Sequence, residues 1–428
     1  MNTIAFMNAR LIDPATGYDE TGNLLVENDI IADFGPTLFN EGAPSNAQII
    51  ECNGNVLCPG LIDMRVFTGE PGAEHRETLG SASQAAAAGG VTSIIVMPNT
   101  NPVIDDVALV DFIARRARDT AIVRVHPMAA LTKGLRGEEM TEMGLLGEAG
   151  AVAFTDGTHY VTHPQIMRRA LSYATFFNAL IVQHAHEPAL VADGVMTEGE
   201  LATRLGLQGI PKAAEVIAIE RDLRLVEITG GRYHVSQVTC IESIEAIRRA
   251  KAKGLSVTCG ASAAHMTLNE NDIGKYLTFC KLDPPLRREE DRQALVEAVA
   301  DGTIDVVVSG HDPQDPETKR LPFQQAAFGA IGLETLLPAT LALVHQEEIT
   351  LSRLLQTMTS APADLLGLKV GHLKKGAAAD LTVMDINVPW ILARDKLKSK
   401  SKNSPWDERR MQGRALHTMV GGKIVHSA

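Results

Sequence analysis

The sequence predicts an α/β protein, a (β/α)8 TIM-type barrel with a small β domain formed by the N- and C-terminal segments. Three observations predict this fold. Eight short runs rich in β-branched residues alternate with helical patterns through the middle of the chain, which is typical of a parallel sheet. Eight such units over about 250–300 residues match the size of a closed barrel. Both chain ends instead alternate apolar and polar residues, as antiparallel strands do.

The expected barrel strands follow one another at regular intervals. In chain order they cover residues 56–64, 91–97, 121–126, 151–155, 179–184, 231–237, 255–259 and 304–309. Two of the helices between them have clear ends. The alanine-rich segment 81–88 stops at Gly89-Gly90, and Pro211 suits the first turn of another helix.

The two ends of the chain share one pattern, an alternation of apolar and polar residues. Residues 2–54 alternate in polarity and are interrupted by turn pairs such as Asp13-Pro14, and residues 376–428 resume this alternation. We therefore predict one composite β domain from residues 1–54 and 370–428, beside a barrel over residues 55–369.

Composition excludes several classes of protein. The chain has 428 residues, of which 45% are hydrophobic and 21% charged, as in an ordinary globular protein. A net charge of −12 argues against nucleic acid or an anionic membrane as the main partner. No apolar run reaches the ~18 residues of a membrane span, and no signal peptide pattern is visible. Five cysteines without CxxC spacing indicate reduced thiols, so we expect a cytoplasmic protein.

Chemistry in a barrel of this type is expected where the strands end. The residues at these strand ends are Arg65, Phe67, Asp156, His184, Gln237, Gly310 and His311. They form an unusual set, because it mixes good metal ligands with residues that cannot bind a metal at all.

Several motifs give the chain a family resemblance. They are Pro59-Gly60-Leu61-Ile62-Asp63, Met97-Pro98-Asn99-Thr100-Asn101-Pro102, Leu131-Thr132-Lys133-Gly134-Leu135, Asp283-Pro284-Pro285-Leu286-Arg287 and Phe328-Gly329. With them the sequence resembles the dihydroorotases that work in complex with aspartate carbamoyltransferase. The matches extend over essentially the whole chain. The resemblance implies a barrel that hydrolyses a cyclic amide in pyrimidine biosynthesis with the help of zinc.

The resemblance also implies six metal ligands, of which this chain keeps two. The retained positions are Asp156 and His184. The replaced positions are Arg65 and Phe67 for a His-x-His pair, Gln237 for a histidine, and Gly310 for the aspartate that is also the general acid/base. Arginine stays protonated and phenylalanine has no lone pair, so neither can bind a metal.

The substrate contacts that the resemblance implies are also altered. An arginine for the substrate carboxylate falls at Gly69, an asparagine at Asp283, and a histidine at Gln314. The expected remnants of the pocket are Asn99, Asp283, Phe328 and Gly329. Asn99 and the Phe328-Gly329 pair have an alternative interpretation as a turn residue and a loop packing point.

These losses predict that no catalytic residue is functional and that no cofactor is bound. The alternative is a single zinc site formed by Asp156, His184 and His311. Asp156 and His184 could equally pair with each other or with Arg65, which would neutralise buried charge.

Three hypotheses for function follow. The first is an inactive dihydroorotase homologue that is a structural or regulatory partner of aspartate carbamoyltransferase and forms at least a homodimer. The second is an active dihydroorotase, or a related cyclic amidohydrolase, that converts dihydroorotate to N-carbamoyl-aspartate with an atypical metal site. The third is a small-molecule sensor in which Arg65 holds a carboxylate.

Overall fold

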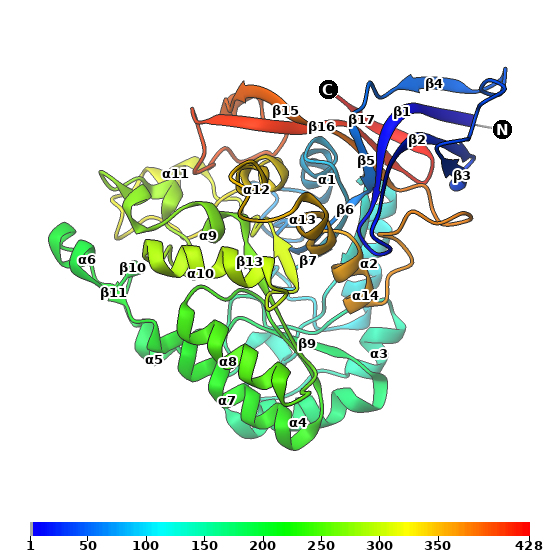
Figure 1. The fold of residues 1–428 in the computed structure, drawn as a ribbon. Coiled ribbons are helices and arrows are strands. Elements are labelled where there is room, and N and C mark those ends of the chain that lie inside the picture. Colours follow the sequence, from blue (N-terminus) through cyan, green and yellow to red (C-terminus); the bar gives the residue numbers. More distant parts are fainter. Residues whose placement is uncertain (1–2) are drawn as a thin grey trace.

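The computed structural model describes residues 3–428, and its fold class is the predicted one. A barrel of parallel strands is surrounded by helices, and a sheet from both chain ends lies along one side (Figure 1). Both termini therefore lie in the same part of the molecule.

Seven strands and one bridging residue form the barrel. The strands are β6 (Leu61–Val66), β7 (Val91–Val96), β8 (Arg124–Pro127), β9 (Leu180–Gln183), β12 (Arg232–Val235), β13 (Val257–Ser262) and β14 (Val306–Val308). Neighbouring strands pair in parallel. Phe154 takes the place of the expected strand 151–155 by bridging to Ala129 and Ile181. A bridge between Val66 and His311 closes the ring.

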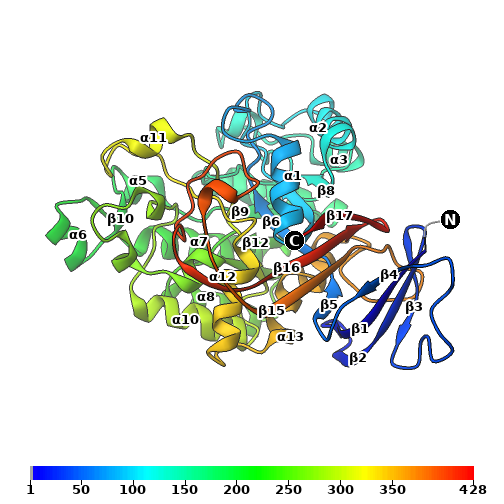
Figure 2. The same ribbon diagram turned by 90° about the horizontal axis from the view of Figure 1, so that it is seen from above.

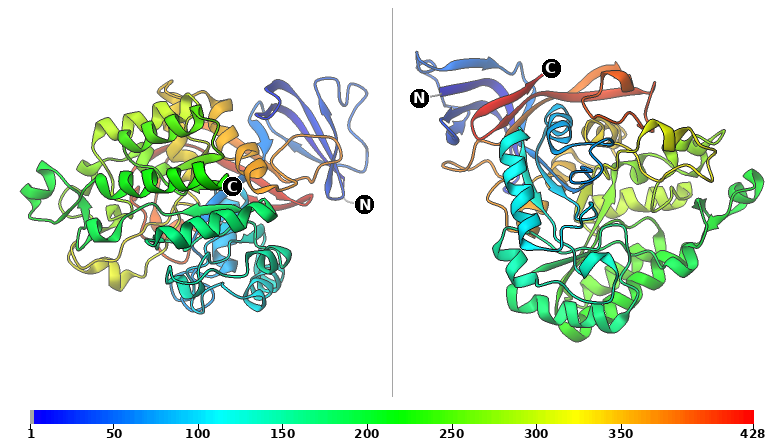
Figure 3. Two further views of the ribbon diagram at one scale, coloured as in Figure 1. Left: turned by 90° about the horizontal axis from the view of Figure 1, so that it is seen from below. Right: turned by 180° about the vertical axis from the view of Figure 1, so that it is seen from behind.

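Helices cover the outside of the barrel (Figure 3). The longer ones are α1 (Leu79–Ala88), α2 (Val107–Thr120), α4 (Pro164–Ala174), α7 (Ala213–Thr229), α8 (Ile241–Ala252), α10 (Glu289–Ala300) and α12 (Leu336–His345). The shorter ones are α3 (Met143–Glu148), α5 (Pro188–Val191), α6 (Glu200–Leu205), α9 (Ala263–Thr267), α11 (Pro316–Arg320), α13 (Leu351–Thr357) and α14 (Ser360–Leu366). As expected, α1 ends at Gly89. The prediction that Pro211 lies in the first turn of a helix is not met, because α7 begins at Ala213 after its N-cap Lys212 and Pro211 precedes both.

A small arm projects from the barrel. It contains α6 and the two-stranded pair β10 (Met196–Thr197) and β11 (Gly209–Ile210) (Figure 2). Arg287 holds this arm to the barrel, because its Nη1 donates to the Ile210 carbonyl at 3.0 Å and to Thr197 Oγ1 at 3.2 Å.

Strands from both chain ends form one sheet. They are β1 (Thr3–Asp13), β2 (Tyr18–Glu27), β3 (Ile30–Gly35), β4 (Gln48–Glu51), β5 (Val56–Pro59), β15 (Leu381–Ile391), β16 (Arg410–Val420) and β17 (Lys423–Ser427). The order β17-β16-β15-β5-β1-β2-β3 joins the two ends through the antiparallel β5–β15 pair. Asp380 ties this sheet to the barrel by pairing with Arg124. The domain boundaries at 54/55 and 369/370 stay a prediction.

The predicted strand 56–64 is wrong as a single element. It divides at Gly60, so that β5 joins the terminal sheet and β6 begins the barrel. A Cβ on Gly60 would lie 2.1 Å from Thr92 Cγ2, so the neighbouring strand comes close only because residue 60 is glycine.

Gly60→Ala is expected to destabilise the protein by about 1–3 kcal/mol, because the added methyl group overlaps the Thr92 side chain. Gly80→Ala in α1 is the matched control. A Cβ there meets its nearest atom at 3.6 Å, and alanine favours a helix over glycine by about 0.5–1 kcal/mol. Urea unfolding measures both changes. Equal unfolding free energies for the two variants would contradict the close approach at Gly60.

Two further expectations concern the whole chain. Within residues 3–428, no helix is long and apolar enough to cross a membrane. The five cysteines are buried and form no disulfide, as their spacing predicts.

Candidate functional site

The predicted site residues gather at one end of the barrel. Arg65 lies at the end of β6, His184 comes directly after β9, and Gln237 lies two residues beyond β12. Gly310 lies two residues beyond β14. This is the C-terminal end of the strands, where barrels of this type place their chemistry.

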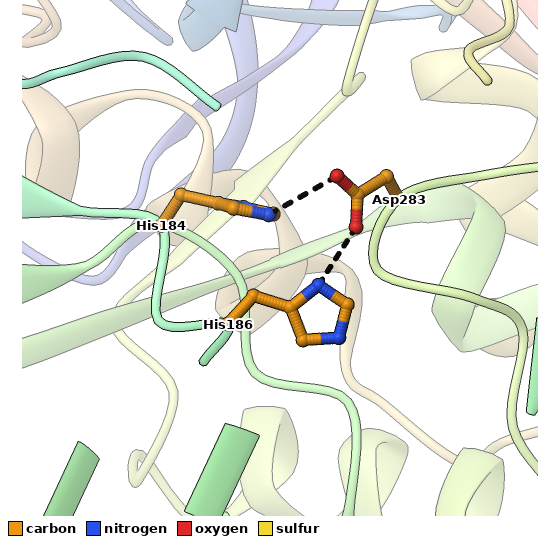
Figure 4. A group of neighbouring side chains, drawn as sticks. All are labelled: His184, His186 and Asp283. Carbon is orange, nitrogen blue, oxygen red and sulfur yellow. Dashed lines mark ion pairs between the residues drawn. The ribbon is translucent and has the colours of Figure 1, made fainter. Parts of the chain in front are cut away.

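His184 does not pair with Asp156 or Arg65, but with Asp283. Its Nε2 lies 3.3 Å from Asp283 Oδ2, and His186 Nδ1 lies 2.9 Å from Asp283 Oδ1 (Figure 4). The two imidazole rings stand at 88° to each other. Burial lowers the pKa of His184. Burial also acts to raise the pKa of Asp283, but the two histidines outweigh it and hold that pKa well below its usual range.

Asp156 is fully engaged by its own neighbours. Its Oδ1 accepts hydrogen bonds from the backbone N–H groups of Leu131 at 3.0 Å and Thr132 at 2.8 Å. Its Oδ2 accepts one from the Thr132 hydroxyl. Burial raises the pKa of Asp156. The carboxylate therefore braces the 131–132 loop and is not free to bridge two metal ions.

Arg65 is a buried cation with an unused donor. It is 7% exposed, and its Nε has no hydrogen-bond partner. Nearby, Phe67 lies under the Arg76 guanidinium, 4.5 Å from the ring centroid. Arg76 in turn donates to Asp312 Oδ1 at 2.8 Å. Where the family resemblance implies two histidines, this chain thus has a guanidinium and an aromatic ring.

Gly310 leaves little room for a side chain. Its φ is +64°, and a Cβ there would lie 3.3 Å from Ser262 Cβ and 3.4 Å from Gln237 Nε2. Gln237 Oε1 is buried without a hydrogen-bond partner. His311 points elsewhere, since its Nδ1 accepts from Gly332 N at 3.1 Å and its Nε2 lies 3.5 Å from Glu77 Oε2.

The predicted trio Asp156, His184 and His311 is not brought together. Within the described part of the chain, the one group of three or more His, Cys, Asp or Glu side chains close enough to share a metal ion is His184, His186 and Asp283. The histidine spacing 184–186 was the available signal, because alternate residues of an extended segment share a face. Asp283 carried no such signal, since it lies about a hundred residues further along the chain.

Of the other expected remnants, Gly329 lines the same cavity as Arg65 and Asp283, whereas Asn99 and Phe328 are not among the residues that line it in the described chain. Asn99 Oδ1 is buried without a hydrogen-bond partner. Lys281 Nζ lies 4.5 Å from the centroid of the Phe328 ring. At Gly329 a Cβ would lie 2.7 Å from Asp312 Oδ2, so glycine there lets Asp312 approach.

Asp312 is a pocket residue that the sequence did not single out. It lines the same cavity as Arg65, Gln237, Asp283 and Gly310. Burial raises its pKa, against the opposing effect of Arg76 and Arg65. The free volume of this cavity is about 20 Å³, room for about one water molecule. An organic substrate therefore enters only if lining side chains or loops move.

Solved structures define the class of the fold. The chain is similar over its full length to the L-hydantoinase (dihydropyrimidinase) from Arthrobacter aurescens, with a TM-score of 0.89, 25% identity, and coverage of 100% of this chain and 96% of that one. The D-hydantoinase from a Thermus species gives a TM-score of 0.84 at 22% identity, covering 99% and 95% of the two chains, and supports the fold. The barrel with its terminal β domain is thus of the amidohydrolase class.

Sequence relatives define the family within this class. A model described as "Dihydro-orotase-like" matches residues 54–243. The chain is 43% identical over 426 residues to the dihydroorotase of Wolbachia sp. subsp. Brugia malayi, covering 99% of this chain and 96% of that protein. It is 44% identical over 423 residues to the dihydroorotase of Pelobacter propionicus, covering 99% of each. The chain belongs to the dihydroorotase family.

This membership overturns one prediction. The expectation of no cofactor is contradicted, because dihydroorotase and hydantoinase relatives place the chain among the metal-dependent amidohydrolases that the resemblance implies. Yet the six-ligand, two-zinc centre does not fit the residues present. Phe67 and Gly310 offer no donor atom to a metal. Both carboxylate oxygens of Asp156 already accept hydrogen bonds from the 131–132 loop.

Proposed function

We propose that this chain is a cyclic amidohydrolase of pyrimidine biosynthesis that interconverts dihydroorotate and N-carbamoyl-aspartate through an atypical site. Membership in the dihydroorotase family supports the reaction. The observation that carries the proposal for this chain is the buried Arg65 guanidinium with its unpartnered Nε at the barrel mouth. Both molecules of the reaction bear a carboxylate, and a guanidinium binds a carboxylate through charge-assisted hydrogen bonds.

Arg65 takes over a role that the family resemblance assigns to position 69, where this chain has glycine. A fixed cation in a pocket with room for about one water molecule orients an anionic substrate strongly, because little solvent screens the charge. In the proposed complex, Arg65 binds the carboxylate and sets the position of the ring amide.

Asp312 supplies the proton in this proposal. It follows the vacant acid/base position 310 by two residues and lines the same cavity. A carboxyl group whose pKa is raised by burial holds a proton closer to neutral pH than an exposed one. Ring opening needs such a proton at the leaving nitrogen.

Arg65→Met tests the binding role. The variant keeps an unbranched side chain but loses the charge, so we expect the Kd for dihydroorotate and for N-carbamoyl-aspartate to rise about 10–100-fold, as for loss of charged hydrogen bonds. Isothermal titration calorimetry measures both constants. Arg168→Met, on the exposed face of α4, is the control and should bind as the unchanged protein does. Equal affinity in Arg65→Met and the control would refute the role of Arg65.

A second candidate is the non-catalytic partner of aspartate carbamoyltransferase, with the chain itself at least a homodimer. The small free volume of the cavity and the absent side chain at Gly310 favour it. Light scattering on the mixed proteins, together with a turnover assay, separates the candidates. Turnover without co-elution supports the enzyme, co-elution without turnover supports the partner, and ligand binding with neither supports a sensor.

A further inference from the structure

We propose that His184, His186 and Asp283 bind one zinc ion in a mononuclear site that replaces the two-metal centre of the family. Only His184 belongs to the ligand set that the family resemblance implies. This metal site is a separate proposal from the reaction proposed above. Zinc binding can be measured without any substrate, so it can be tested independently of turnover.

The geometry suits a single small cation. One donor atom from each of the three residues lies within 4.8 Å of the other two. The pairs His184 Nε2–Asp283 Oδ2 and His186 Nδ1–Asp283 Oδ1 are separated by 3.3 and 2.9 Å. Tetrahedral zinc with bonds of about 2.1 Å separates its ligands by about 3.4 Å. Small side-chain rotations therefore bring the three donors to bonding distance around one ion.

The cluster leaves polar atoms unsatisfied. His184 Nε2 and Asp283 Oδ1 are buried, and neither forms a hydrogen bond. Their contacts within the cluster are the ion-pair distances of 3.3 Å from His184 Nε2 to Asp283 Oδ2 and 2.9 Å from Asp283 Oδ1 to His186 Nδ1. His184 is 2% exposed and His186 is 4% exposed. An unsatisfied buried polar atom costs about 1–3 kcal/mol, and such atoms in a native protein point to a missing partner. A cation between them supplies that partner.

The surrounding charge tolerates a cation in spite of Arg65. Three carboxylates act on this one guanidinium, those of Asp312, Asp283 and Asp63. Arg76 forms an ion pair with Asp312 and, within the described chain, with neither Asp63 nor Asp283. Asp283 shares the offsetting of Arg65 with Asp312 and Asp63, and its direct ion-pair contacts are with the two histidines, where a divalent ion would compensate its charge.

The ligand types select the metal. Two imidazoles and one carboxylate form the three-ligand set typical of catalytic zinc, with a fourth position open to water or substrate. Magnesium and calcium prefer sites made of oxygen ligands. The two histidines come from the segment directly after β9, and Asp283 comes from the loop after the short helix Thr278–Cys280. The site therefore joins two separate parts of the barrel mouth.

Zinc titration of the untagged full chain, stripped with EDTA and dialysed, tests the proposal. We expect one zinc per chain by calorimetry and a rise in melting temperature with added zinc. Cobalt in place of zinc should give the visible absorption of a four-coordinate ion. His186→Ala and Asp283→Asn should each weaken zinc binding at least 100-fold.

Two controls keep the test decisive. His163→Ala removes an exposed histidine at the start of α4, and Asp156→Asn alters a retained family ligand position, so both should keep one zinc. Circular dichroism shows whether each variant is folded, and Asp283→Asn preserves the shape of the side chain. No zinc binding by the unaltered chain, two zinc ions per chain, or loss of zinc in Asp156→Asn but not in His186→Ala would each overturn the site. Zinc binding without turnover would leave the site standing and remove the proposed activity.

Discussion

Glu215→Ala is expected to lower the free energy of unfolding by about 3–5 kcal/mol, because it leaves a buried cation without its carboxylate. Glu215 is completely buried and accepts hydrogen bonds from the backbone N–H of Thr239 at 2.8 Å and from the Thr239 hydroxyl. Its Oε2 lies 3.7 Å from Nη2 of Arg287, which is 3% exposed and has no hydrogen bond at that nitrogen.

Loss of the Glu215 carboxylate should also disturb the position of Asp283 at the barrel mouth. Arg287 lies four residues after Asp283 and anchors the projecting arm to the barrel. Urea unfolding measures the stability change, with Glu220→Ala as control. Glu220 pairs with Arg249 on the surface, where both side chains are well exposed, and such pairs contribute about 0–1 kcal/mol. A Glu215→Ala variant as stable as the control would show that the buried network contributes little.

The double variant Arg65→His with Phe67→His is expected to lose activity and not to gain it. It restores the His-x-His pair of the family, but Gln237 and Gly310 still offer neither the third histidine nor the aspartate. Asp156 remains bound to the 131–132 loop. The change also removes the cation that holds the substrate carboxylate in our proposal, so turnover should fall at least 10-fold.

Turnover of dihydroorotate and zinc content, measured on the same sample, check this expectation. Phe67→His alone is the control, since it leaves Arg65 in place. Higher turnover together with a second zinc ion in the double variant would show that the family centre can be rebuilt from two positions. Such a result would show that neither the missing side chain at Gly310 nor the hydrogen bonds of Asp156 prevent a two-metal centre.

Much of the fold follows from local pattern. The alternation of apolar strands and helices predicts the barrel, and strand polarity predicts the sheet of the chain ends, because both depend on residues near in sequence. The division at Gly60 was not predicted. It depends on the close approach of Thr92 from the next strand, which no local pattern records.

The site was predicted less completely than the fold. Arg65, His184 and Gly310 lie at the barrel mouth because each is at or just beyond the end of a strand, and the topology places all strand ends together. The partners of these residues depend on loops. Asp156 accepts a hydrogen bond from the backbone of Thr132, and His184 forms an ion-pair contact with Asp283. Both contacts join parts of the chain that are distant in sequence. The ligand positions carried over from the family could not indicate these pairings, because the family fills the same space with other side chains.

A crystal of the zinc-loaded chain, with diffraction measured on both sides of the zinc absorption edge, locates the bound metal directly. We expect one anomalous peak per chain, about 2.0–2.2 Å from ligand atoms of His184, His186 and Asp283. Two peaks beside Asp156 and His184, or a single peak that touches neither His186 nor Asp283, would contradict this expectation.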